Sequence, residues 1–92
     1  MDSNNKLSYT ENAAIELIVE ELIKARNDNP KFNSTHEGFA VLMEEVDELW
    51  DEVKQKHQIG IKMQIEAIQV GAMAIRFLTD CCPVGKKEAT NG

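Results

Sequence analysis

The residues best suited to chemistry lie in the stretch from Glu44 to Glu52, where six of nine side chains carry a carboxylate. Like charges crowded on one helix repel each other and reduce its stability. These carboxylates are therefore either the solvated side of a helix or a group that holds a cation. Large apolar residues alternate with them at helical spacing, so a helix is expected in both cases.

On a helix that turns by 100° per residue, the six carboxylates divide into two sets. The first set lies within about 60° on the face that flanks the apolar stripe at Leu49, and it consists of Glu45, Glu48 and Glu52. The second set lies on the other flank and consists of Glu44, Asp47 and Asp51. We expect the first set to bind a divalent cation and the second to be solvated.

Glu66 and Gln69 form another pair of oxygen-bearing side chains, in a segment that is apolar around most of its circumference. An unpaired carboxylate is costly in such a place, so Glu66 needs a partner. If two antiparallel helices meet at the break HQIG, residues 57–60, this pair can face Glu45 and Glu48. Four oxygen ligands suit Mg²⁺, or Mn²⁺, with waters kept for a ligand that carries phosphate.

A solvated acidic face without any ligand is the competing interpretation, because acidic runs on amphipathic helices usually face water. In that case Glu66 pairs with Lys62, and Arg76 pairs with Asp80, both at i, i+4 spacing. That interpretation offers no reason for two separate oxygen pairs on adjoining helices.

Three helices and no strand are expected to position these side chains, so the predicted fold class is all-α. They run from about Thr10 to Asn27, from a Ser34 cap to about Val53, and from about Ile61 to Cys82. The third helix is apolar almost all round, which is typical of a helix inside a structure. We therefore expect a three-helix chain that forms a four-helix-type bundle through oligomerisation. It has one domain, residues 1–83, and a disordered tail, residues 84–92.

Composition excludes several classes of protein. The formal net charge of −6 argues against binding to a nucleic-acid backbone. The polar N-terminus lacks a signal-peptide core, and charged residues interrupt the most apolar segment, so we expect no membrane span. The only two cysteines are adjacent and cannot form an ordinary disulfide with each other. These features favour a reduced, cytoplasmic protein.

Several other side chains have two possible roles. Trp50 lies in the apolar stripe and is expected in the core, with stacking on a base as the alternative. Phe32 precedes the helix cap and is a candidate for stacking on a base. His36 is expected at the surface or in the cap, and Cys81 and Cys82 are expected to be apolar filler at a helix end.

The text EEVDELWDE, followed by KMQIEAIQVGAMAIRFLTD, resembles the motif region of the MazG-like all-α nucleoside triphosphate pyrophosphohydrolases. The family pattern is ExxE, a spacer and ExxD on two helices. Here the pattern is Glu45-x-x-Glu48, then 17 residues, then Glu66-x-x-Gln69. The resemblance covers residues 36–80, about half of the chain, and departs from the family at Gln69, where the family has aspartate.

The resemblance implies a homodimer or homotetramer that hydrolyses a nucleoside or deoxynucleoside triphosphate to the monophosphate and pyrophosphate. It also implies four ligands for Mg²⁺, namely Glu45, Glu48, Glu66 and Gln69. Glu48 or Glu52 would orient or deprotonate the attacking water. The substrate would be bound by Arg76 and Lys62 on its phosphates and by Phe32 on its base.

Glutamine at position 69 removes one negative charge, so it weakens the metal site and the activation of water. The sequence therefore leans towards an enzyme but leaves a second reading open. In that reading the chain is a degenerate relative that oligomerises, or binds nucleotide, without turnover.

Overall fold

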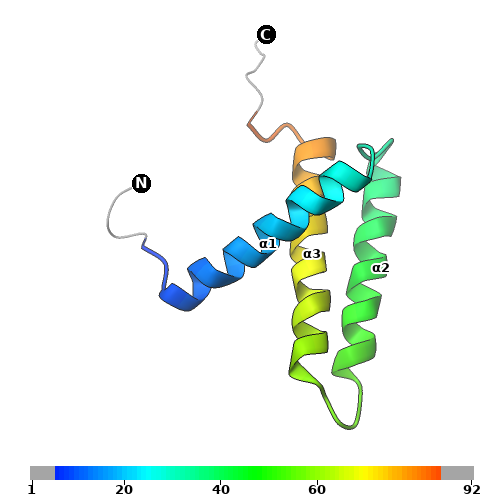
Figure 1. The fold of residues 1–92 in the computed structure, drawn as a ribbon. Helices are drawn as coiled ribbons and strands as arrows, with labels where there is room; N and C mark the ends of the chain where they lie inside the picture. Colours follow the sequence, from blue (N-terminus) through cyan, green and yellow to red (C-terminus); the bar gives the residue numbers. More distant parts are fainter. Residues whose placement is uncertain (1–5, 86–92) are drawn as a thin grey trace.

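The computed structural model describes residues 6–85, which form three helices and no strand (Figure 1). Helix α1 spans Tyr9–Asp28, α2 spans Thr35–Val53 and α3 spans Gly60–Cys81. The all-α prediction is confirmed, and the predicted helix bounds differ by only one residue at each end. Most of the tail predicted as disordered, residues 86–92, lies outside the described residues.

Local hydrogen bonds explain where α1 begins. The Ser8 hydroxyl accepts from the Glu11 N–H at 3.0 Å, and the Glu11 carboxylate accepts from the Ser8 N–H at 2.8 Å. This is a complete capping box, and it starts the helix one residue before the predicted position.

The capping box predicted for α2 is only half formed. The Ser34 hydroxyl accepts from the Glu37 N–H at 3.0 Å, as expected. The Glu37 carboxylate, however, accepts from the N–H of Asn33 and not from that of Ser34. The backbone donor it satisfies thus lies one residue further back along the loop.

Helices α2 and α3 form an antiparallel hairpin, and α1 crosses α3 obliquely (Figure 1). The core lies where α1 meets α3, around Ala25, Ala72 and Met73, all at most 6% exposed. Gly71 permits this crossing, because a Cβ at that position would lie 2.7 Å from Cδ1 of Ile18. The hairpin confirms the antiparallel arrangement on which the predicted oxygen ligands depend.

Large apolar side chains remain exposed on every helix. On α3 they include Ile61 at 57% and Ile65 at 46% exposed, although this helix was expected to be interior. Trp50 is 57% exposed, so its prediction as a core residue is wrong for the single chain. The reason is that α2 packs only against α3, which leaves the far flank of its apolar stripe uncovered.

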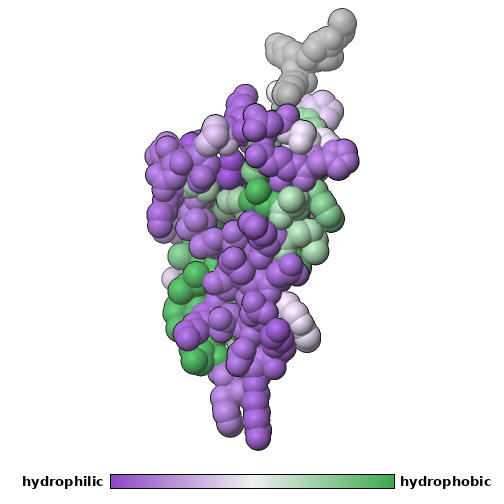
Figure 2. Space-filling view, turned by 90° about the vertical axis from the view of Figure 1, so that its right-hand side faces the viewer, coloured by the Kyte–Doolittle hydropathy of each residue, from purple (hydrophilic) through white to green (hydrophobic). Residues whose placement is uncertain are grey.

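The surface carries these apolar groups in patches. Figure 2 shows apolar side chains gathered on both sides of a polar band that runs down the molecule. No helix of the described part of the chain is long and apolar enough to cross a membrane.

Candidate metal centre

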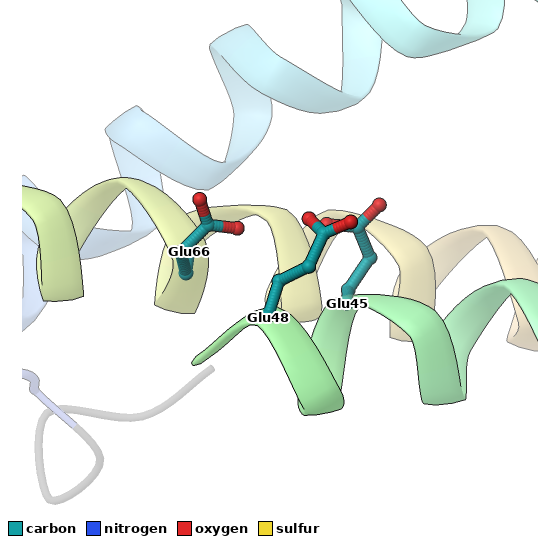
Figure 3. Close-up of side chains that lie close together, drawn as sticks. All are labelled: Glu45, Glu48 and Glu66. Carbon is teal, nitrogen blue, oxygen red and sulfur yellow. The ribbon is translucent and has the colours of Figure 1, made fainter. Parts of the chain in front are cut away.

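Three carboxylates from two helices meet on one side of the α2–α3 hairpin (Figure 3). Glu45 and Glu48 stand one turn apart on α2, and Glu66 comes from the facing turn of α3. One carboxylate oxygen from each lies within 4.8 Å of the other two. We call these three residues the acidic triad. The structure thus brings together three of the four predicted metal ligands.

The triad lies at the boundary between core and solvent. Glu45 and Glu66 are half-buried, whereas Glu48 is exposed. In each of the two half-buried residues, Oε1 is buried and has no hydrogen-bond partner among the described residues. Buried polar atoms in native proteins are almost always paired, so these two oxygens call for a partner from outside the chain.

Burial and repulsion between neighbouring carboxylates make Glu45 and Glu66 harder to ionise. Burial, followed by the negative charge of Glu48, raises the pKa of Glu45 from 4.5 to about 7. Burial and the charges of Glu48 and Glu52 also raise the pKa of Glu66. Over residues 6–85 the only ion pair joins Lys54 to Asp51, on the opposite flank of α2, and no basic side chain pairs with the triad.

These observations fit a hard divalent cation. The donors are all carboxylate oxygens, which Mg²⁺ and Mn²⁺ prefer. A bound cation would also reverse the repulsion that raises the two pKa values. Ion binding would supply the partner that both buried oxygens lack.

The two other residues of the predicted site, Glu52 and Gln69, lie close to the triad. Glu52 is half-buried, and its charge acts on Glu66. Gln69 is half-buried and lines the same groove as Glu45. The second set of acids, predicted to be solvated, is exposed throughout: Glu44, Asp47 and Asp51.

The groove beside the triad has a volume of about 310 Å³ and is lined by groups of both signs. We call it the central groove. Its acids are Glu21, Asp28, Glu37 and Glu45. Its bases are Lys24, Lys31 and Arg76. Cationic side chains therefore lie along the same groove as a carboxylate of the triad, and a metal-bound phosphate group would need both.

Arg76 is 6% exposed as a whole residue. Its guanidinium donates from Nη2 to the Pro30 carbonyl at 2.8 Å and lies 4.3 Å from the centre of the Phe32 ring. It forms no ion pair with Asp80, whereas its contact with a phosphate stays a prediction. The Asp80 carboxylate instead accepts from the Phe32 N–H at 3.2 Å. Both side chains hold the loop between α1 and α2.

Phe32 is half-buried; its ring packs against the core, and the Arg76 guanidinium lies over it. Phe32 also lines the central groove, so its stacking on a base stays a prediction. Lys62 is exposed and forms no ion pair with Glu66. His36 is exposed on the first turn of α2, as predicted.

The two cysteines are free thiols at the end of α3, and both are half-buried. The Cys81 thiol points to the Ser34 carbonyl at 3.8 Å, and burial raises its pKa. A Cβ on Gly38 would lie 3.1 Å from the Cys81 sulfur. These contacts agree with the prediction that the cysteines are filler.

Sequence reasoning missed Lys24 and Lys31 as lining residues of the central groove. Both lie near the end of α1, a segment that the motif does not include. The available sequence signal was the basic residues on each side of the NDNP turn, residues 27–30. This turn ends α1 near the end of α3.

Comparison with known proteins yields no matching family model, no matching curated protein and no matching solved structure. Membership of residues 36–80 in the MazG-like family stays a prediction.

Proposed function

We propose that this protein hydrolyses a nucleoside or deoxynucleoside triphosphate to the monophosphate and pyrophosphate, with Mg²⁺ or Mn²⁺ as cofactor. The observation that supports this function is the acidic triad, with two buried carboxylate oxygens that lack a partner. The central groove, with its three basic side chains, gives an anionic substrate a place beside the triad.

Each residue of the site would have a defined role. The triad, with the carbonyl oxygen of Gln69, would hold the ion. When bound, Mg²⁺ would offset the negative charge on the phosphate oxygens. Lys24, Lys31 and Arg76 line the groove in which those oxygens would lie.

A carboxylate must also orient the attacking water and accept its proton. Glu48 is the exposed member of the triad, and Glu52 lies one turn further along α2. Glu52 is the better candidate base when all three triad residues bind the ion, because its oxygens stay available for water.

The chain is proposed to work as a homodimer or homotetramer. The support is the apolar surface that a single chain leaves bare, notably Ile61 and Ile65 on α3 and Leu17 on α1. An apolar hollow of about 340 Å³ lies between the same two helices. A second copy that packs there would complete a four-helix-type bundle and cover surface that monomers rarely expose.

A degenerate module without turnover is the alternative function, and one observation favours it. The structure places glutamine, and not a fourth acid, beside the triad. Three carboxylates can bind a divalent ion, but a neutral amide leaves the site less able to activate water.

Release of pyrophosphate from a panel of ribonucleoside and deoxynucleoside triphosphates tests both functions, with Mg²⁺, with Mn²⁺ and with EDTA. We expect turnover that depends on the metal and stops in EDTA. If folded, oligomeric protein hydrolyses no nucleotide, the enzyme proposal is wrong. Gln69→Asp then distinguishes a degenerate site, which this change would reactivate, from a site with another purpose.

A further inference from the structure

Arg76 is a buried charge that no carboxylate neutralises. It is 94% buried, on a helix end that also carries Asp80, yet the only ion pair over residues 6–85 is elsewhere. A guanidinium has five N–H donors. Two of them have partners within this range, the Pro30 carbonyl and the Met73 sulfur. An uncompensated charge at such a depth is strongly unfavourable unless an anion comes from outside.

Asp80, one turn further along α3, forms no ion pair with Arg76. One of its oxygens accepts from the Phe32 N–H at 3.2 Å, and the other accepts from the Thr79 hydroxyl at 3.3 Å. Asp80 is thus bonded to the loop and not to the Arg76 guanidinium.

Arg76 also faces a second hollow, which adjoins the central groove and shares four lining residues with it: Asn29, Pro30, Lys31 and Arg76. This hollow has a volume of about 460 Å³ and lies between the end of α1, the loop after it and the end of α3. We call it the loop hollow. Its charged lining residues are Arg26, Lys31, Arg76 and Asp80. No member of the acidic triad lines it.

The sign of the charge distinguishes the two hollows. The loop hollow has three bases and one acid, whereas the central groove has three bases and four acids. A net positive lining is unusual in a chain whose formal charge is −6. Arginine and lysine side chains around a buried guanidinium are the groups that bind phosphate oxygens.

We propose that the loop hollow is a binding site for a phosphate group, held by Arg26, Lys31 and Arg76 without a metal ion. The same chemistry suits free pyrophosphate and the phosphates of a nucleotide. Lys31 and Arg76 also line the central groove, so the proposal shares these two side chains with the proposed hydrolase. It needs neither the acidic triad nor turnover, so binding in EDTA tests it apart from hydrolysis.

The chain offers matched variants for the test. Arg26 lines only the loop hollow, Lys24 lines only the central groove, and Lys56 lines neither; all three side chains are exposed. None of Arg26→Gln, Lys24→Gln and Lys56→Gln removes a core contact, so all three proteins should fold. Isothermal titration with pyrophosphate, in EDTA and at low fixed ionic strength, measures their affinities.

We expect saturable binding of pyrophosphate that Arg26→Gln weakens by about tenfold, the loss of one charge-assisted contact. Lys56→Gln should leave the affinity within about twofold. The proposal is overturned if pyrophosphate does not bind in EDTA, or if Lys24→Gln or Lys56→Gln weakens binding as much as Arg26→Gln does.

A parallel titration with a nucleoside triphosphate, also in EDTA, identifies the source of the phosphate group. Tighter binding of the nucleotide, with the same loss in Arg26→Gln, assigns the site to nucleotide phosphates. Equal or weaker binding of the nucleotide assigns it to free pyrophosphate. Both results support a phosphate site in the loop hollow.

Discussion

The middle of the α2–α3 hairpin and the loop at its open end present the same electrostatic problem with opposite signs. In the hairpin, Glu45 and Glu66 have buried oxygens without a partner. At the loop, Arg76 is buried without a carboxylate. A chain that contains both charges does not pair them. The two regions thus differ in the sign of the buried group that lacks an ionic partner, and for this reason we propose a cation as the ligand of one and a phosphate anion as the ligand of the other.

The acidic region is tested most severely by Glu45→Gln, which keeps the shape of the side chain and removes its charge. We expect metal-dependent turnover to fall by about 100-fold or more, because one of three carboxylate ligands is lost. Asp47→Asn, on the solvated flank of the same helix, should keep turnover within about twofold. Equal activity of Glu45→Gln and wild type would show that the triad does not hold the catalytic ion.

The basic region is tested by Arg76→Ala, which removes the bond to the Pro30 carbonyl and the stacking on Phe32. We expect the free energy of unfolding to fall by about 2–3 kcal/mol in urea titrations. Lys62→Ala, at an exposed position of the same helix, should change it by less than about 0.5 kcal/mol. A loss of similar size in both variants would mean that Arg76 does not fix the loop.

The pH dependence of stability tests the acidic region by itself, because burial and neighbouring negative charges raise the pKa of two of its carboxyls, Glu45 and Glu66. The folded protein keeps the proton on Glu45 up to about pH 7, whereas a free glutamate loses it near 4.5. Between these values the folded state binds the extra proton, so stability falls as the pH rises through this window. In EDTA, we expect the melting temperature to drop from pH 5 to pH 7.5.

Addition of Mg²⁺ at pH 7.5 should restore that melting temperature, because an ion that binds only the folded state stabilises it. Glu45→Gln should show a flatter profile and little response to Mg²⁺. A wild-type profile as flat as that of Glu45→Gln would contradict the raised pKa.

The smallest expected effect is a gain in stability in a variant that is expected to lose its activity. Glu45→Gln should stabilise the metal-free protein at pH 8 by about 1 kcal/mol, because it removes a charge that its neighbours repel. The gain is small because solvent still reaches the site. Urea unfolding in EDTA measures it. Loss of stability in this variant would mean that the triad already has a partner within the chain.

Local patterns predicted the helices and the triad well, for physical reasons. The positions of Glu45, Glu48 and Glu66 depend only on helical periodicity and on an antiparallel hairpin with a short connection. Periodicity is a property of neighbouring residues, so it can be read from sequence. The half-formed capping box at Ser34 shows the limit of such patterns. The spacing was predicted correctly, but the Glu37 carboxylate accepts from the Asn33 N–H and not from the Ser34 N–H.

The contacts of Arg76 could not be predicted from such local patterns. Its partners, Pro30 and Phe32, lie more than forty residues away along the chain, on the other side of α2. The i, i+4 spacing predicted an ion pair with Asp80 instead, but the Asp80 carboxylate accepts from the Phe32 N–H of the same loop. Trp50 failed for a related reason: an apolar stripe indicates burial but does not say whether the same chain supplies the cover.

The oblique crossing of α1 should set an order of opening in solution. Because α1 meets α3 only where the two helices cross, whereas α2 runs alongside α3, the amide hydrogens of α1 should exchange with deuterium sooner than those of the α2–α3 hairpin. The loop that follows α1 is held to α3 by Arg76 and Asp80, so its opening must break the contacts of both with Pro30 and Phe32. A ligand bound between the end of α1 and α3 would hold these two helices together. It would therefore slow hydrogen exchange in α1 more than in either helix of the hairpin.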